Sequence, residues 1–577
     1  RKYYNTMERG KTKILIIALV AVAVLTVLVA VGLGIGLGVG LRKGAVSQQA
    51  YQHAAVATDA AMCSQVGADI LKKGGSAVDS AVASMFCVGV VNLHSTGVGG
   101  GGFMVYYNAT SRKSTFIDFR EVAPLYATEN MYLNNSSTKG GLAIAVPGMV
   151  RGLETAWKMF GRLKWADLVQ PSIDIARNGF SVTQTVADAI QTRLNDIISG
   201  KFPGLQAIVA PQNQTLKKGD TLKQLHLAET LANISLYGAD YIYNSSFTSD
   251  MVNELRQDYG SILSVDDFLN YTAQVREVLT SQFSGLQVLG ASPPSSGAAV
   301  AMVLNILEGY NWTAKDFGGL TYHRIVEAIK FAYAQRMLLE DPSFNSTVQQ
   351  TVQLMLSSSE ASRIRSLITD NTTHNISYYK LPEFFSPLSN SGTSHLTVLA
   401  SNGDAVSTTG TINDLLGSLV CSKKSGIIFN DEMDDFGAPN KECSLCLPPN
   451  YIEPGKRPQS SMSPTIMLDK NGKVKMVIGA SGGAMIPPAI LQAVLQVLLF
   501  NRTLADAINY PRLYHRLIPN QVTAEQKFPM EYQQALTTRG HKVVVNNNLA
   551  VVQGIEVIDG LLYAVSDPRK GGAPAGY

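Results

Sequence analysis

The chain has 577 residues, of which 46% are hydrophobic and 16% are charged, with a formal net charge of +4. The hydrophobic content excludes an intrinsically disordered protein. The balanced charge provides no long-range field for a polyanion, so no nucleic-acid partner is expected. Five cysteines are too few for a fold held together by disulfides. We therefore expect a globular protein with a large buried core.

The N-terminal region contains a long apolar segment. Residues 14–41 carry no charged side chain, and about 20 apolar residues are enough to span a bilayer. Basic residues are more numerous before this segment than just after it, which predicts a cytoplasmic tail at 1–13 and a transmembrane signal-anchor at 14–41. A cleaved signal peptide is the alternative, but its apolar region usually has only about 7–15 residues. We expect a single-pass type II protein of the cell membrane with its catalytic domain outside the cell.

Twelve N-x-S/T sequons support this orientation, and eleven of them precede residue 393. They predict a glycoprotein of the secretory pathway. The acceptors are Asn108, Asn134, Asn135, Asn213, Asn233, Asn244, Asn270, Asn311, Asn345, Asn371, Asn375 and Asn501.

The cysteines can oxidise outside the cell. Cys63 and Cys87 are close enough in sequence to pair across neighbouring helices. Cys443 and Cys446 form a C-x-x-C, which predicts either a short structural bridge or two unpaired thiols, and Cys421 is left over. The eight histidines show no metal-ligand spacing, so no metal is expected.

Hydrophobic spacing predicts the elements of the first half. Residues 53–92 favour helices, and 103–107 and 115–117 favour strands. Residues 150–310 are expected to be mostly helical, and 318–340 to form one long amphipathic helix.

The second half begins with a change of pattern. Residues 341–392 are rich in Ser, Thr and Asn and predict a mobile surface linker. Strands are then predicted at 394–400 and 405–411, joined at Asn402-Gly403, which is a strong hairpin signal. A second strand pair at 465–468 and 474–478 and a helix at 487–500 follow. These hairpins and helices together predict antiparallel sheets covered by helices.

The glycine run at 97–102 satisfies G-x-G-x-x-G, the fingerprint of a dinucleotide site. That site requires a strand before the loop and a helix after it. Here the order is reversed, so a close approach of the backbone beside a buried site is the better interpretation.

Residues 479–483 form a G-x-S-x-G, which makes Ser481 a candidate nucleophile. In a nucleophile elbow the helix begins at the serine, whereas here it is expected only from Pro487. The two glycines after Ser481 could instead present backbone N–H groups to an oxyanion.

Thr393 is the third candidate. A threonine that becomes N-terminal through chain cleavage can use its own α-amino group as the base. A two-residue hairpin turn places Thr393 opposite Ile412, whereas a one-residue bulge places it directly opposite Thr411.

Several segments resemble the γ-glutamyltransferase (glutathione hydrolase) family, and the resemblance runs from about residue 50 to Tyr577. It implies an α+β fold, the αββα four-layer sandwich of N-terminal-nucleophile hydrolases, which cuts itself into a large subunit (42–392) and a small catalytic subunit (393–577). The segments are 54–57, 74–79, 97–102, 120–124, 393–398, 411–413, 430–436, 460–462, 482–483 and 567–572.

The resemblance also implies a role for each matched residue. Thr393 would be the nucleophile, Thr411 would hold its amine or hydroxyl, and Gly482 and Gly483 would supply the oxyanion N–H groups. Two further sets would bind the ends of the γ-glutamyl group: Arg120, Ser460 and Ser461 its α-carboxylate, and Asn413, Glu432 and Asp435 its α-amino group.

The implied activity is cleavage of the γ-glutamyl amide bond of glutathione and its S-conjugates through an acyl-enzyme. Water, an amino acid or a dipeptide would accept the γ-glutamyl group, with no metal or organic cofactor. A relative that prefers leukotriene-type glutathione conjugates is one alternative. An inactive glycoprotein that keeps the fold is the other, and intact Thr393, Thr411 and Arg120 argue against it.

Overall fold

The computed structural model describes residues 49–310, 312–380, 392–437, 448–547 and 550–577. The chain divides into the units Arg1–Ser47 and Gln48–Tyr577. The predicted tail (1–13) and signal-anchor (14–41) lie outside the described residues. Among the helices that are described, none is both long enough and apolar enough to span a bilayer.

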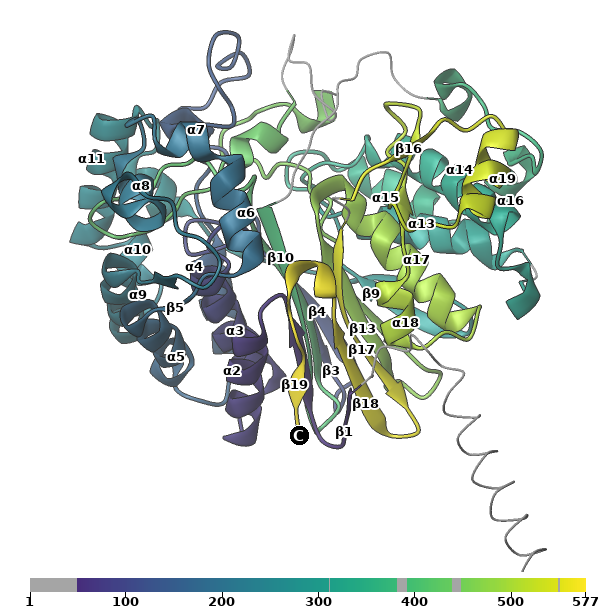
Figure 1. Ribbon diagram of the computed structural model, residues 1–577, viewed down its shortest axis with the longest axis horizontal. Helices are drawn as coiled ribbons and strands as arrows, with labels where there is room; N and C mark the ends of the chain where they lie inside the picture. The colour runs from purple at the N-terminus through teal and green to yellow at the C-terminus, as the bar shows by residue number, and fades with distance from the viewer. Residues whose placement is uncertain (1–48, 311, 381–391, 438–447, 548–549) are drawn as a thin grey trace, which may run out of the picture. The chain divides into compact units, whose positions relative to one another are not determined.

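Two antiparallel sheets of seven strands each form the centre of the second unit (Figure 1). Sheet one has the order β1 (Gln49–Tyr51), β18 (Leu561–Ser566), β17 (Val551–Ile558), β13 (Val474–Ser481), β12 (Thr465–Leu468), β9 (Leu286–Gly290) and β8 (Leu279–Phe283). Sheet two has the order β19 (Ala575–Gly576), β2 (Ala55–Thr58), β10 (Gly392–Leu399), β11 (Ala405–Asn413), β3 (Gly101–Asn108), β4 (Lys113–Phe119) and β7 (Gln274–Arg276).

Helices cover the outer face of each sheet, which completes the four layers that the sequence predicted (Figure 1). On sheet two lie α2 (Ala61–Lys72), α3 (Ala77–Val91) and α4 (Met149–Phe160), and α5 (Trp165–Asn178) packs against α3. On sheet one lie α13 (Gly297–Glu308) and α17 (Ile486–Leu498), and α14 (Gly319–Arg336) packs against α13.

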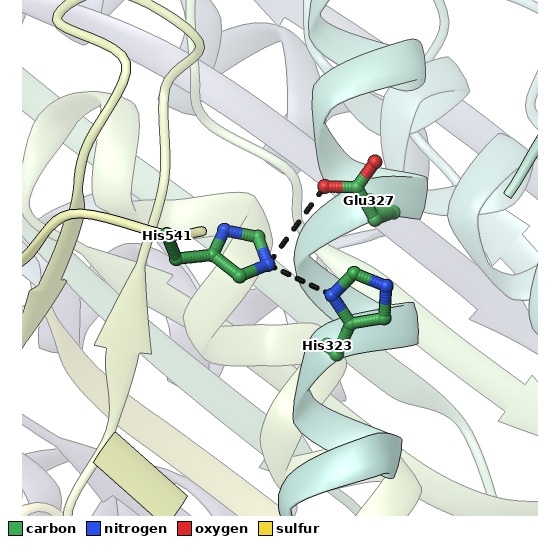
Figure 2. A group of neighbouring side chains, drawn as sticks. All are labelled: His323, Glu327 and His541. Atoms are coloured by element: carbon green, nitrogen blue, oxygen red, sulfur yellow. Dashed lines mark hydrogen bonds and ion pairs between the residues drawn. The ribbon is translucent and has the colours of Figure 1, made fainter. Parts of the chain in front are cut away.

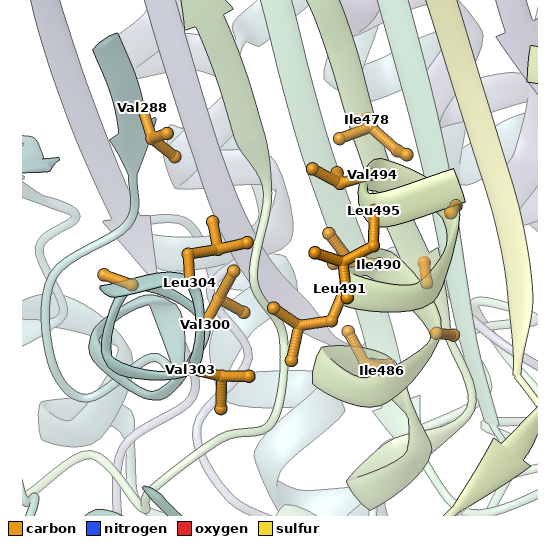
Figure 3. Close-up of a cluster of buried hydrophobic side chains, with 14 of the residues drawn as sticks. Val288, Val300, Val303, Leu304, Ile478, Ile486, Ile490, Leu491, Val494 and Leu495 are labelled. Carbon is orange, nitrogen blue, oxygen red and sulfur yellow. The ribbon is translucent and has the colours of Figure 1, made fainter. Parts of the chain in front are cut away.

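The apolar faces of α13 and α17 pack together and against sheet one (Figure 3). Val300 and Leu304 of α13 and Ile490 and Leu491 of α17 are each at most 3% exposed. Burying one such side chain contributes roughly 1.5–3 kcal/mol. α17 begins with two prolines in its first turn, where the missing N–H groups have no helical partner in any case.

A disulfide joins α2 and α3 through Cys63 and Cys87, a pairing that their spacing in the sequence allowed. A capping box between Ser76 and Asp79 begins α3. Cys421 is a buried free thiol, and Cys443 and Cys446 lie outside the described residues.

The turn between β10 and β11 differs from the predicted two-residue turn. Ala400 and Asp404 close a three-residue loop in which Gly403 has φ 86°. This loop shifts the register by one residue, so Thr393 lies directly opposite Thr411, and a further irregularity falls between Gly392 and Thr393. The bulged alternative is therefore correct.

The region 150–310 is mostly helical, as predicted, and it also contains β7, which completes sheet two, and β8 and β9, which complete sheet one. One other prediction needs correction: 341–380 is not an irregular linker, since it contains α15 (Val348–Leu356) and α16 (Ser358–Leu367), which pack against α13. Both helices are short, and packing against α13, α14 and each other buries the apolar side chains that each of them carries.

Candidate active site

Thr393 lies at the N-terminal end of β10 and pairs with Thr411 of β11, whereas β2 pairs with β10 only further along, from Leu396 to Leu399. Thr393 Oγ1 lies 3.4 Å from Thr411 Oγ1, and the Thr411 hydroxyl donates to the Gly392 carbonyl oxygen at 2.7 Å. A Cβ on Gly392 would lie 2.2 Å from the Asp414 carbonyl oxygen, so only glycine fits there. The Gly392–Thr393 bond is thus held between two hydroxyl groups.

Arg120, just after β4, is the centre of a buried cluster of charges. Its guanidinium donates to Glu432 and Asp435, which lie on the short 3₁₀ helix Glu432–Asp435. Its Nε also donates to the Pro458 carbonyl oxygen at 3.3 Å, and its Nη2 to that of Gln459 at 3.1 Å. Because Arg120 is only 1% exposed, these partners replace the water it has lost.

Burial and charge oppose each other in this cluster. Burial lowers the pKa of Arg120, but the carboxylates of Glu432 and Asp435 outweigh it and raise that pKa above its ordinary value. Burial also raises the pKa of Glu121 to about 7, against the attraction of Arg120. Within the described chain, neither carboxyl oxygen of Glu121 has a hydrogen-bond partner. Glu121 is thus a buried acid whose charged form is poorly solvated.

Nine of the ten predicted site residues line one cavity of about 40 Å³, and Gly482 directly precedes one of them. The predicted lining residues are Arg120, Thr393, Thr411, Asn413, Glu432, Asp435, Ser460, Ser461 and Gly483.

Asn413 and Ser461 have polar atoms directed by their neighbours. Asn413 has φ 71°, a conformation that asparagine tolerates, and its Nδ2 donates to the Asp431 carbonyl oxygen at 3.1 Å. Its Oδ1 is therefore available to accept from an ammonium group. Ser461 Oγ accepts from Arg336 Nη2 at 2.9 Å, which leaves its hydroxyl hydrogen free to donate.

Arg336 is a lining residue that the sequence did not reveal. It ends α14, is 5% exposed, and its Nε donates to Ser296 Oγ at 2.6 Å. Burial lowers the pKa of this guanidinium. The sequence around Arg336 predicted only an amphipathic helix and gave no sign of a role in the site. The packing of α14 against α13 is what brings the end of α14, with Arg336, to the cavity.

Gly482 and Gly483 follow β13 with φ values of 125° and 58°, and Gly483 begins a short 3₁₀ helix that leads into α17. A Cβ on Gly482 would lie 2.8 Å from Ala550 Cα. Ser481 is the last residue of β13, is 2% exposed and pairs with Val551. The lining of the cavity includes Thr393 but not Ser481, which disfavours the serine as the nucleophile.

The glycine run at 97–102 leads into β3, and its role here is close packing. A Cβ on Gly100 would lie 1.9 Å from the Thr411 carbonyl oxygen, and one on Gly99 would lie 2.2 Å from that of Ile428. The run thus lets the backbone lie directly behind Thr411, as the sequence indicated.

One histidine cluster was not predicted from the spacing. His323 Nδ1 and His541 Nε2 are 2.8 Å apart, and Glu327 lies one turn beyond His323 on α14 (Figure 2). Their ligand atoms are close enough together to hold a metal ion. However, Glu327 Oε1 already accepts from Lys330 Nζ at 3.0 Å and from Thr373 Oγ1 at 2.7 Å. A cation in direct contact with the carboxylate opposes a second one, so the cluster favours a hydrogen-bonded network.

The comparisons with known proteins agree with this geometry. The family model Gamma-glutamyltranspeptidase matches residues 63–577. Glutathione hydrolase 2 of Arabidopsis thaliana is 39% identical over 549 residues, covering 91% of this chain and 94% of its own.

Two solved structures are also similar. The crystal structure of cephalosporin acylase from Bacillus halodurans has a TM-score of 0.82 at 24% identity and covers 92% of this chain and 97% of its own. The crystal structure of Helicobacter pylori gamma-glutamyltranspeptidase has a TM-score of 0.51 at 30% identity and covers 56% of this chain and 93% of its own. Since the family model spans nearly all of the described residues and the plant relative is similar over nine-tenths of the chain, this protein belongs to the gamma-glutamyltranspeptidase family.

Proposed function

We propose that this protein cleaves the γ-glutamyl amide bond of glutathione and its S-conjugates and passes the γ-glutamyl group to water, an amino acid or a dipeptide. One observation carries the proposal: the Thr393 hydroxyl shares a cavity with Arg120, Glu432 and Asp435. A γ-glutamyl group is a zwitterion attached to an acyl carbon. The cavity offers it a cation, two carboxylates and a nucleophile.

The reaction requires that the chain first cut itself at Gly392–Thr393. Thr411 polarises the Gly392 carbonyl by its hydrogen bond of 2.7 Å, and the Thr393 hydroxyl attacks that carbon. As the C–Oγ1 bond forms, the C–N bond to Thr393 breaks and its nitrogen takes the hydroxyl proton, which frees the α-amine; water then hydrolyses the ester, which separates the chains and restores the Thr393 hydroxyl. The family is processed into two subunits, and this cut would give the large subunit 42–392 and the small subunit 393–577, with the segment 1–41 preceding them.

In the mature enzyme the Thr393 amine takes the hydroxyl proton while Oγ1 bonds to the γ-carbonyl carbon. The N–H groups of Gly482 and Gly483 stabilise the oxyanion. Arg120, Ser460 and Ser461 bind the α-carboxylate, while Asn413, Glu432 and Asp435 bind the α-amine. The leaving amine receives the proton, and water or an acceptor amine then releases the acyl group.

Release of aniline from L-γ-glutamyl-anilide by the purified protein tests this function. L-α-glutamyl-anilide is a matched control because it has the same atoms and charge type with the two carboxyl positions exchanged. We expect rapid release from the γ compound and little from the α compound. Equal rates on both, or release from neither, would refute the proposal.

We also propose that residues 14–41 anchor the protein in the cell membrane with the catalytic domain outside. The uncharged run and the basic residues before it support this topology. The eleven sequon asparagines that lie within the described residues are all at least partly exposed, as glycan acceptors must be. Glycosidase treatment of the surface protein should lower its apparent mass substantially, and an unchanged mass would refute this topology.

A further inference from the structure

A lysine near the C-terminus contacts the residue that carries the nucleophile. Lys570 Nζ donates to the Thr393 carbonyl oxygen at 2.6 Å, to Ser394 Oγ at 3.2 Å and to Asp59 Oδ2 at 2.7 Å. Lys570 is 8% exposed. An ammonium group therefore lies directly behind the first residue of the small subunit.

The surrounding structure holds this ammonium in place. Asp59, between β2 and α2, is fixed by Gln553 Nε2, which donates to its Oδ1 at 2.6 Å. A Cβ on Gly572 would lie 2.4 Å from the Thr58 carbonyl oxygen, so glycine lets the segment after Lys570 pack against the end of β2. Asp567 caps the 3₁₀ helix Pro568–Lys570. Lys570 thus has little freedom to withdraw from Thr393.

The contact matters because the Thr393 nitrogen is to become a free amine. The nitrogen and carbonyl oxygen of one residue lie about 3–4 Å apart by covalent geometry. The Lys570 ammonium therefore lies within roughly 6 Å of that amine, a range in which a like charge disfavours protonation. We propose that Lys570 is a positioning residue for the Thr393 base, which fixes the Thr393 carbonyl and keeps the α-amine unprotonated at neutral pH.

The inference rests on the proposed function, because it assumes that Thr393 acts with its own amine as base. The proton of Oγ1 moves to the amine as the Oγ1–C bond forms. The same proton passes to the leaving nitrogen as the C–N bond breaks. A protonated amine cannot begin this sequence, so the charge beside it sets the pH at which the enzyme becomes active.

Other charged groups face Thr393 from three sides. Towards the cavity, the cations Arg120 and Arg336 stand with the carboxylates Glu432 and Asp435, so their charges largely cancel. Behind Gly392, Asp414 is paired with Arg193 at 3.1 Å, and burial raises the pKa of Asp414 to about 6.

His94 lies on the side of Lys570. Burial and the charge of Lys570 hold the pKa of His94 well below its usual range, so this imidazole is neutral. Asp59 opposes Lys570, but its carboxylate contacts Thr393 through the ammonium rather than directly. Lys570 therefore acts on the amine from the shorter distance.

The test compares the acidic limb of the pH profile of kcat/KM in Lys570→Met and Asp59→Asn, measured on the cleaved fraction of the full chain with L-γ-glutamyl-anilide. Lys570→Met should move this limb to higher pH by about one unit. At a pH below the wild-type midpoint this corresponds to about a tenfold loss. Asp59→Asn leaves the ammonium uncompensated and should move the limb to lower pH.

Lys570→Arg keeps the positive charge, so the acidic limb of its kcat/KM profile should lie at the wild-type pH even if kcat falls. Lys475→Met is the matched control, because it removes a lysine paired with Glu556 at 3.2 Å on sheet one and should leave the limb unchanged. A purely structural role for Lys570 would not produce shifts of opposite sign in the first two variants.

If the acidic limb moves in the same direction in Lys570→Met and Asp59→Asn, or moves in neither, the inference is overturned. The proposed function is unaffected by that result as long as the wild type is active. An inactive wild type would refute the proposed function instead. If Lys570→Met fails to cleave itself, the downward shift of Asp59→Asn is still required, and its absence overturns the inference.

Discussion

Two parts of the active site are built in contrasting ways. The hairpin of β10 and β11 brings Thr393 and Thr411 together across one short loop. The charged wall, which is formed by Arg120, Glu432, Asp435 and Arg336, collects side chains from three distant parts of the chain. The hairpin positions the reacting bond by local register, whereas the wall depends on how whole layers pack.

The two parts also differ in the kind of groups that they hold. The hairpin holds neutral hydroxyl groups on two paired strands in the middle of sheet two. The wall holds buried charges whose desolvation must be offset by one another until a ligand arrives. We therefore expect substitutions in the hairpin to abolish chemistry and substitutions in the wall to weaken recognition.

Removing the nucleophile is the largest expected change. Thr393→Ala lacks the hydroxyl that must attack Gly392, so the protein should remain one inactive chain of full length. Thr393→Ser keeps a hydroxyl and should cleave, with some activity. Gel analysis and N-terminal sequencing check this, and the small fragment of the wild type should begin Thr-Ser-His-Leu. A fully active single chain would contradict the mechanism.

Removing one charge from the wall should spare self-cleavage but weaken catalysis. Arg120→Ala or Asp435→Ala leaves one end of the γ-glutamyl zwitterion unpaired in a buried pocket. Such a loss costs about 2–5 kcal/mol, or roughly 30- to 5,000-fold in kcat/KM. Steady-state kinetics on cleaved protein measure the effect. Normal cleavage together with wild-type kcat/KM in Arg120→Ala would show that the clamp is wrongly assigned.

The buried acid beside Arg120 should make stability depend on pH. The pKa of Glu121 is raised from 4.5 to about 7 by burial, so its neutral form is favoured in the folded state. Its contribution to stability is complete below about pH 4.5 and is lost as pH rises through 7, by up to ~3 kcal/mol.

Glu121→Gln removes this dependence. The difference in melting temperature between the variant and the wild type should therefore change in favour of the variant as the pH rises from 4.5 to 8. Glu129 is exposed, so Glu129→Gln serves as the control, and its melting temperature should vary with pH as that of the wild type does. A parallel curve for Glu121→Gln as well would show that Glu121 is already ionised in the folded protein.

The smallest effect is expected at the competing serine. Ser481→Ala keeps the backbone N–H groups of Gly482 and Gly483, and Ser481 does not line the cavity. Cleavage should be normal and kcat/KM should stay within about twofold, since no transition-state contact is removed. An inactive Ser481→Ala beside a working Thr393→Ala would favour a serine hydrolase.

Much of the hairpin could be predicted from the sequence, because alternating side chains and a turn signal are local features. The length of the turn could not, and one residue there decided whether Thr393 faces Ile412 or Thr411. The short strands β7 to β9 were also missed, since they add to one side of sheets that are formed largely by distant segments.

By itself the sequence determined the nucleophile candidate and the pattern of antiparallel sheets covered by helices. Through resemblance it also gave nine residues that share the cavity with Thr393 or directly precede Gly483. Only the tertiary structure decided that Arg336 joins them, that Ser481 does not, and that Lys570 lies behind Thr393. Such contacts join residues far apart in the chain, and no local pattern encodes them. They form when the layers pack and buried charges must find partners.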